Sequence, residues 1–298
     1  MYAITGATGH TGSAIAEKLL AKGEKVRVIG RDARRLEKFT KKGAEAAIAE
    51  MSDAAALAKA FTGAKAAYVL VPPDMTSNDY RAYQERISDA VASAIEKSGL
   101  KYAVVLSSFG ANQPDKNGPV AGLYSLEKKI GRIAGVNALF LRPGYFMENF
   151  LPQLDVIKSM GMMAGPVRAD LPLPLIATRD IGAAAAGALL KLDFQGKQSR
   201  ELQGPADVNY QQAAKIVGRA IGRPDLIYQQ APAAMLKPAM IGMGMSANTV
   251  DLILEMAEAL NTGHMKMLEP RSAQNSTPTT LETFAADTFG PAYTAAGA

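Results

Sequence analysis

The chain has 298 residues, enough for one large domain or two of ordinary size, and 48% of them are hydrophobic, which excludes a disordered chain. It contains no cysteine, so disulfides, thiolate nucleophiles and cysteine-ligated metals are excluded. His10 and His264 lie far apart in the sequence, and we predict no metal site. Without a basic leader segment or an apolar run of about 18 residues, the sequence predicts a cytoplasmic protein that makes no membrane contact.

The net charge of +5 comes from one short segment of the chain. Between Lys22 and Lys42, nine basic residues minus three acidic residues give +6, so the other 277 residues together carry −1. A nucleic-acid binder would spread its basic residues more widely, and we therefore predict no nucleic-acid partner. The block indicates either a local anionic ligand or an ordinary solvated helix face.

Residues 1–150 alternate short apolar runs with helical stretches. Strands are expected at residues 2–5, 25–29, 46–49, 66–71, 102–106 and 138–141. Helices are expected at residues 13–22, 33–42, 53–61, 78–97 and 124–133. Apolar strands separated by helices are typical of a parallel sheet that is covered on both faces. The pattern predicts an α/β fold with a doubly wound, Rossmann-type sheet that forms a dinucleotide-binding domain.

Residues 151–298 are less regular and predict a smaller C-terminal α/β substrate lobe, interleaved with the end of the sheet. Helices are expected at 180–190 and 210–221, and strands at 201–203 and 226–229. Seven of the fourteen methionines lie between Met235 and Met267. Thioether side chains adapt to aromatic rings, so this segment fits either a mobile apolar wall for a flat substrate or ordinary core packing.

The turn between the first strand and the first helix, residues 5–12 (TGATGHTG), has a G-x-x-G-x-x-G pattern. Glycine is needed where the backbone turns sharply, approaches a pyrophosphate and lets a helix pack closely against a strand. Free N–H groups at the start of the helix and the helix dipole then bind phosphate. The position of these glycines predicts a dinucleotide site rather than a merely structural turn.

The end of the second strand indicates which dinucleotide binds. An NAD site commonly has an acidic residue there, whereas this chain has Arg31, with Arg35 one helical turn further on. Guanidinium groups bind a 2′-phosphate through charge-assisted hydrogen bonds, which favours NADP(H). Asp32 leaves an alternative open, because it would bind a ribose hydroxyl if the strand ended one residue later.

Several segments resemble the NmrA-like family of atypical short-chain dehydrogenases/reductases. They are residues 5–12 (TGATGHTG), 105–108 (VLSS), 141–149 (LRPGYFMEN), 178–182 (TRDIG) and 201–232. The resemblance implies an extended Rossmann fold with a small C-terminal substrate lobe. Members of the family include NADPH-dependent quinone, azo-dye and triphenylmethane-dye reductases, and regulators that bind a dinucleotide without turning it over.

The resemblance also implies where the cofactor and the substrate bind. The cofactor contacts carried over from the family are Gly6, Gly9, His10, Thr11 and Gly12 at the diphosphate, Arg31 at the 2′-phosphate, Glu50 and Met51 at the adenine, and Val71, Pro72 and Pro73 at the nicotinamide side. Further cofactor contacts are predicted at Thr8, Arg35, Ser107, Lys128, Pro143, Tyr145 and Phe146. Tyr145, Phe146 and Asn149 are also expected to face the substrate cleft.

Tyr124 and Lys128 have the Tyr-x-x-x-Lys spacing of short-chain dehydrogenases. Residues four apart share a helix face, so the ammonium group would favour the ionised phenol and could also hold the ribose. Ser108, at a strand end, would polarise the substrate carbonyl. The spacing also arises by chance on helices, and many family members keep only the lysine, so a catalytic Tyr124 and a lysine that only contacts the cofactor both stay open.

These features predict an NADPH-dependent reductase that transfers hydride to a hydrophobic, aromatic acceptor such as a quinone or an azo dye, acting as a monomer or homodimer. A regulator that binds NADP(H) without turnover is the alternative from another class. An isomerase or epimerase with a bound cofactor is disfavoured, because the lobe lacks an arginine cluster for a substrate diphosphate.

Overall fold

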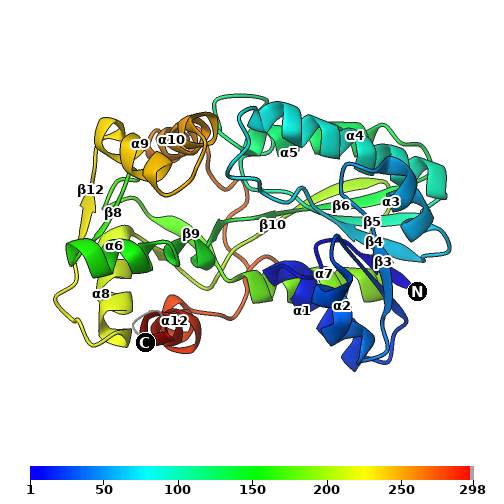
Figure 1. The fold of residues 1–298 in the computed structure, drawn as a ribbon, viewed down its shortest axis with the longest axis horizontal. Helices are drawn as coiled ribbons and strands as arrows, with labels where there is room; N and C mark the ends of the chain where they lie inside the picture. Colours follow the sequence, from blue (N-terminus) through cyan, green and yellow to red (C-terminus); the bar gives the residue numbers. More distant parts are fainter. Residues whose placement is uncertain (296–298) are drawn as a thin grey trace.

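Seven parallel strands form the central sheet of the computed structural model, which describes residues 1–295 (Figure 1). In the order in which they lie side by side, they are β10 (Lys197–Leu202), β6 (Asn137–Pro143), β5 (Tyr102–Leu106), β4 (Ala66–Val69), β1 (Tyr2–Ile4), β2 (Val26–Gly30) and β3 (Glu45–Ile48). The strand order reverses between β1 and β4, and doubly wound sheets bind ligands at such a point, beyond the carboxyl ends of the strands. The predicted Rossmann-type fold is confirmed.

Helices cover both faces of this sheet (Figure 1). One face carries α1 (His10–Ala21), α2 (Ala33–Thr40) and α7 (Thr178–Lys191), and the other carries α3 (Ala54–Phe61), α4 (Tyr80–Ser98) and α5 (Val120–Gly131). Each helix buries an apolar stripe against the sheet, as Ile15 and Leu19 do in α1 and Val91 and Ile95 do in α4. None of the helices among residues 1–295 is long and apolar enough to cross a membrane.

The second half of the chain builds a separate hydrophobic core beside the sheet. Its strands are β7 (Tyr145–Phe146), β8 (Met163–Gly165), β9 (Leu173–Ile176), β11 (Asp207–Val208) and β12 (Tyr228–Gln230). Its helices are α6 (Gln153–Met160), α8 (Tyr210–Ala220), α9 (Ala233–Gly242), α10 (Ala247–Asn261), α11 (Leu281–Phe284) and α12 (Gly290–Ala295), with the 3-10 helix η1 (Met147–Phe150) and the π-helix η2 (Ala285–Phe289). These elements lie beyond the carboxyl ends of β5 and β6, so they face the expected ligand edge (Figure 1).

Part of the second half returns to the sheet. β10 pairs in parallel with β6 from Lys197↔Ala138 to Leu202↔Pro143, and α7 packs against α1. The sequence predicts a strand only at residues 201–203, because the first half of β10 is polar and lacks an apolar pattern. That polarity fits an edge strand whose first three residues are exposed.

Three other boundaries near the expected site differ from the sequence prediction. α1 begins at His10 rather than at residue 13, because Gly9 has an extended conformation and serves as the N-cap. β4 ends at Val69, two residues before the predicted end, because its pairing with β5 stops at Val105. α5 begins at Val120, four residues earlier than expected, so Tyr124 lies in its second turn.

Candidate active site

In the glycine turn after β1, two glycines lie so close to neighbouring atoms that a side chain would not fit. Gly6 has a φ of +60°, which disfavours other residues, and a Cβ added there would lie 2.8 Å from Cδ2 of Leu70. A Cβ added to Gly12 would lie only 2.3 Å from the carbonyl oxygen of Gly6. The first turn of α1 can therefore pack onto the loop only because residue 12 has no side chain.

The N-terminus of α1 presents its backbone donors at this turn. Gly9 caps the helix without a side-chain hydrogen bond, and its carbonyl accepts from Ser13. Within residues 1–295, no acceptor is found for the N–H groups of His10, Thr11 and Gly12. His10 is exposed and Thr8 is half-buried beside them. Free N–H groups at a helix start are suited to a diphosphate, so the turn fits the predicted dinucleotide.

The Thr11 side chain has a structural partner. Its hydroxyl accepts a hydrogen bond of 2.8 Å from the hydroxyl of Tyr68, and both residues are buried between α1 and β4. Burial raises the pKa of Tyr68, which keeps this hydroxyl a donor. The Thr11 hydroxyl still has its own proton to donate, so the diphosphate contact of Thr11 stays a prediction. Tyr68 is a supporting residue that the sequence pattern does not reveal.

Arg31 follows β2 directly, Arg35 lies in the first turn of α2, and both are exposed. In the described part of the chain neither guanidinium has an ion-pair or hydrogen-bond partner. Asp32, in contrast, caps α2 by accepting a 2.9 Å hydrogen bond from the N–H of Arg34, and lies 3.6 Å from the Arg34 guanidinium. Because β2 ends at Gly30, Asp32 does not occupy the strand end at which an acidic residue binds a ribose.

Three other members of the basic block already have partners, among them Lys41, whose Nζ lies 3.4 Å from Oε2 of Glu37. Arg27 forms a bidentate ion pair with Glu45, at 2.8 and 3.1 Å, and also donates to the carbonyls of Ala60 and Thr62. Lys38 donates to the hydroxyl of Ser13 at 3.0 Å. The +6 charge of this block therefore overstates what it offers to a ligand, because Arg27 holds β2 and β3 together.

The residues predicted at the adenine and nicotinamide ends lie on loops that leave the sheet. Glu50 follows β3 and is exposed, whereas Met51 packs on the core beneath α3 and α4. Val71 packs on the same core. The carbonyl of Pro72 accepts a 2.9 Å hydrogen bond from the Tyr83 hydroxyl, which fixes the loop after β4.

A buried network joins the ends of β5 and β6 to α5. Ser107 donates a 2.5 Å hydrogen bond to Oε1 of Glu127, and Arg142 donates from Nε and Nη2 to the same carboxylate at 2.9 and 2.6 Å. The Glu127 and Arg142 side chains are 9% and 14% exposed. The Ser107 proton is thus engaged by Glu127, and a cofactor contact by this hydroxyl would use its oxygen as an acceptor.

Neither Glu127 nor Arg142 is among the residues predicted from the sequence. The available signal is a charged residue at an inward-facing position of a helix, immediately before Lys128. The network fixes α5 against the sheet and so positions the catalytic candidates on that helix.

Replacing Glu127 with glutamine is expected to destabilise the fold by about 3 kcal/mol, because the change leaves the Arg142 guanidinium buried without its counter-charge. Chemical denaturation measures the change in the free energy of unfolding. Glu85→Gln is the matched control: Glu85 pairs with Lys129 at 2.6 Å but is 46% exposed, so less than about 1 kcal/mol should be lost. Equal losses in the two variants would show that the buried network stabilises the fold no more than an exposed ion pair does.

Tyr124 and Lys128 do lie together on α5. The Nζ of Lys128 is 5.1 Å from the centre of the Tyr124 ring, Lys128 is exposed, and Tyr124 is half-buried. Ser108 is half-buried just beyond β5. Among the described residues no hydrogen-bond partner is found for the Tyr124 hydroxyl, the Ser108 hydroxyl or the Lys128 ammonium group. These three groups are therefore available to a ligand.

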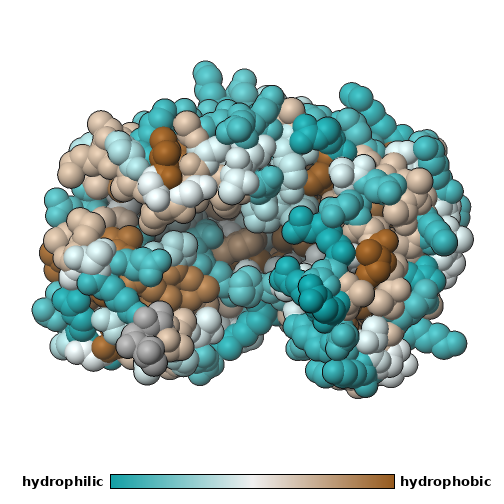
Figure 2. Space-filling model, in the orientation of Figure 1, coloured by the Kyte–Doolittle hydropathy of each residue, from teal (hydrophilic) through white to brown (hydrophobic). Residues whose placement is uncertain are grey.

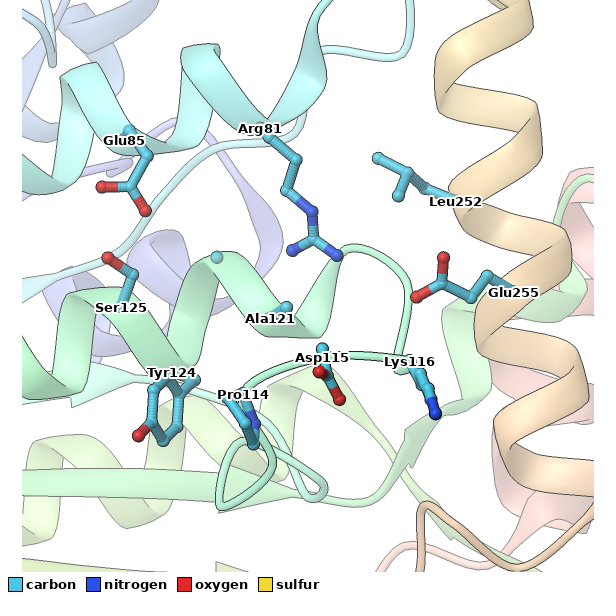
Figure 3. Close-up of a pocket in the computed structure, with 11 residues that line it drawn as sticks. Arg81, Glu85, Pro114, Asp115, Lys116, Ala121, Tyr124, Ser125, Leu252 and Glu255 are labelled. Carbon is cyan, nitrogen blue, oxygen red and sulfur yellow. The ribbon is translucent and has the colours of Figure 1, made fainter.

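Tyr124 also lines a cavity of about 510 Å³ between α4, α5 and α10 (Figure 3). Arg81 extends into it from α4, and Glu255 extends into it from α10. Glu255 accepts a 3.1 Å hydrogen bond from the N–H of Gly118, which ties the second lobe to the loop between Ser108 and α5.

A hollow with a hydrophobic floor separates the two halves of the molecule (Figure 2). Pro143 is buried at the end of β6, and the next strand places Tyr145 and Phe146 at this boundary. Phe146 packs on the core of the sheet, Tyr145 packs on the core of the second half, and Asn149 is exposed.

The methionine-rich segment is divided between two environments. Met265 is buried against the loop that contains Gly110, in line with core packing. α9 has no buried residue at all, and the exposed fractions of Met235 and Met243 are 69% and 59%. Core packing therefore accounts for Met265, and the apolar wall stays a prediction for the exposed methionines.

The fold and the glycine turn together define a Rossmann-type dinucleotide-binding protein with an added lobe. A model of the NmrA-like family matches residues 2–285, and the chain belongs to that family, as its sequence resemblance predicts. Grouped metal-ligating side chains were not found within residues 1–295.

Two curated relatives match most of the chain. It is 30% identical over 226 residues to a (4-alkanoyl-5-oxo-2,5-dihydrofuran-3-yl)methyl phosphate reductase of Streptomyces griseus, covering 75% of each chain. It is 26% identical over 258 residues to an NAD(P)H azoreductase of Xenophilus azovorans, covering 86% of each chain. Among solved structures, an NADPH-dependent quinone oxidoreductase of Escherichia coli in complex with NADPH is similar, with a TM-score of 0.81 at 22% identity over 97% of this chain and 100% of that chain.

Proposed function

We propose that the protein is an NADPH-dependent oxidoreductase that reduces a hydrophobic, aromatic acceptor such as a quinone or an azo compound. The observation that carries this proposal is the set of unpartnered donors at one sheet edge. The N–H groups at the start of α1, the guanidinium groups of Arg31 and Arg35, and the ammonium group of Lys128 suit the phosphates and ribose of NADPH. The names of the similar azoreductase and quinone oxidoreductase support the same class.

The chain's own residues would bind the cofactor, orient the acceptor and protonate it. The hydride comes from the nicotinamide C4 of bound NADPH, which is chemistry that the cofactor supplies. The start of α1 holds the diphosphate, Lys128 holds the ribose, and the Ser108 hydroxyl polarises the acceptor. Tyr124 or water then gives a proton to the reduced acceptor. The apolar floor of the hollow between the halves excludes water from a flat aromatic ring.

Arg31→Ala combined with Arg35→Ala is expected to weaken NADPH binding about 10- to 100-fold and to leave NADH binding nearly unchanged, because each guanidinium loses a charge-assisted hydrogen bond to the 2′-phosphate. Titration calorimetry measures both dissociation constants. The control is Lys22→Ala combined with Lys42→Ala, which also removes two positive charges, but from the ends of the basic block. Equal weakening of NADPH and NADH would contradict the assignment of the 2′-phosphate site.

Turnover tests the proposed function itself. The purified protein is mixed with NADPH, then with NADH, in the presence of quinones and azo dyes, and cofactor oxidation is followed by absorbance. We expect oxidation of NADPH with at least one acceptor. Tight NADP(H) binding without turnover on any acceptor would instead identify a dinucleotide-sensing regulator.

A further inference from the structure

Three tyrosines from different elements meet in the second half of the protein. Tyr145 comes from β7, Tyr210 begins α8, and Tyr228 begins β12. The hydroxyl oxygens of Tyr145 and Tyr210 are 2.9 Å apart, and the rings of Tyr210 and Tyr228 stack with their centres 4.2 Å apart. The Tyr228 hydroxyl is occupied, since it donates to the carbonyl of Val167 at 2.7 Å.

Which hydroxyl donates the hydrogen bond between Tyr145 and Tyr210 follows from the other partners available to each. Tyr210 is only 5% exposed, and in the described part of the chain its hydroxyl has one partner, Tyr145. If Tyr145 donated, the Tyr210 proton would stay buried without an acceptor, at a cost of about 1–3 kcal/mol. Tyr145 is partly exposed, and Asn149, four residues further along the chain, is exposed. Tyr210 is therefore the donor, and Tyr145 keeps its own proton, for which no acceptor is found within residues 1–295.

Tyr145 stands at the sheet edge where the acceptor is expected. It follows Pro143, the last residue of β6, by two positions. The Pro143 carbonyl accepts a 3.0 Å hydrogen bond from the N–H of Phe109, which is the residue after Ser108. Phe109 and Tyr145 also belong to the same hydrophobic core. Ser108 and Tyr145 thus border the same end of β5 and β6.

We propose that the Tyr145 hydroxyl donates a hydrogen bond to a carbonyl oxygen of the acceptor, and that Tyr210 is the positioning residue that aims it. This inference rests on the proposed function and narrows its substrate class to quinone-type carbonyl compounds. When the C4–H bond of NADPH breaks, the hydride carries two electrons into the quinone, and negative charge gathers on its oxygen. A donor placed there stabilises that charge, and the oxygen then takes its proton from Tyr124 or water.

The chemistry of the tyrosine pair suits a lasting hydrogen-bond donor better than an acid. Burial raises the pKa of Tyr145, and burial together with the neighbouring Tyr145 raises that of Tyr210 well above its ordinary range. Both hydroxyls therefore keep their protons across the neutral and moderately alkaline range. Loss of the Tyr145 hydroxyl should reduce the rate by the same factor at every pH in that range.

The test uses the full-length protein with NADPH and 1,4-naphthoquinone. Tyr145→Phe should lower kcat about 100-fold, equally at about pH 6 and about pH 9, with an unchanged dissociation constant for NADPH. Tyr210→Phe should cause a smaller loss, because it removes only the group that aims the Tyr145 hydroxyl. The double variant should be no slower than Tyr145→Phe alone, because Tyr210 acts only through that hydroxyl. Tyr228→Phe is the matched control: it deletes a hydroxyl from the same cluster and should retain turnover.

Each other outcome is decisive. If Tyr145→Phe reduces naphthoquinone as fast as the wild-type protein, the role of Tyr145 is overturned and the proposed function stays intact. An equal loss in Tyr228→Phe would overturn it as well, because the effect would then come from core packing. If the wild-type protein fails to oxidise NADPH with every acceptor offered, both proposals are overturned. If Tyr145→Phe is unstable, the comparison of Tyr210→Phe with Tyr228→Phe decides in the same way.

Discussion

Alanine in place of Gly12 is expected to abolish useful NADPH binding, with a loss of affinity of about 100-fold or more. The new methyl group would lie 2.3 Å from the Gly6 oxygen, 2.6 Å from the Gly6 carbonyl carbon and 3.0 Å from the Ala7 nitrogen. All three atoms belong to the backbone, so no side chain can move aside. The start of α1 must then shift away from the turn, which costs about 1–3 kcal/mol and moves the N–H donors from the diphosphate.

The control for this change is a glycine with room around it. Gly187 lies in α7, and a Cβ added there meets no atom within 4 Å, so Gly187→Ala should stabilise the helix by up to about 1 kcal/mol. Titration with NADPH and thermal unfolding are measured for both variants. Wild-type affinity and stability in Gly12→Ala would show that the turn does not cradle the cofactor.

Phenylalanine in place of Tyr124 is expected to lower kcat by about 10²- to 10⁴-fold if its hydroxyl is the proton donor. The hydroxyl has no partner in the described part of the chain, and Lys128 lies over its ring. NADPH binding should be unchanged, because the phenylalanine keeps the ring beside the lysine. Steady-state rates with a quinone, combined with NADPH titration, separate the two effects.

Tyr102→Phe is the matched control for this substitution. Tyr102 begins β5, at the opposite end of the strand from Ser107, and packs edge-on against Phe194. It should turn over NADPH at the wild-type rate. If Tyr124→Phe is as fast as Tyr102→Phe, water is the proton source and Lys128 acts only on the cofactor.

Much of the fold follows from local patterns in the sequence. The buried strands β1, β4, β5 and β6 are apolar runs, and the glycine turn falls between β1 and α1 as the spacing of its glycines predicts. β10 was less visible, because an edge strand with exposed Lys197 and Gln198 carries no apolar signal. Strand pairing between residues about sixty positions apart cannot be read from such a segment.

The candidate site was predictable where a short motif carries it and not where distant side chains meet. The spacing of Tyr124 and Lys128 places them together because four residues make about one helical turn. The Ser107–Glu127–Arg142 network and the contact of Tyr145 with Tyr210 join separate elements. Their partners become visible only after the sheet and the second lobe are folded.

Single-turnover mixing of the protein–NADPH complex with 1,4-naphthoquinone tests most directly whether this chain moves hydride from NADPH to an aromatic carbonyl acceptor. We predict that one hydroquinone forms for each NADPH oxidised. The reaction should be slower when the transferred hydrogen at C4 is replaced by deuterium. NADPH that remains bound and unoxidised in the presence of the quinone would contradict this hydride transfer.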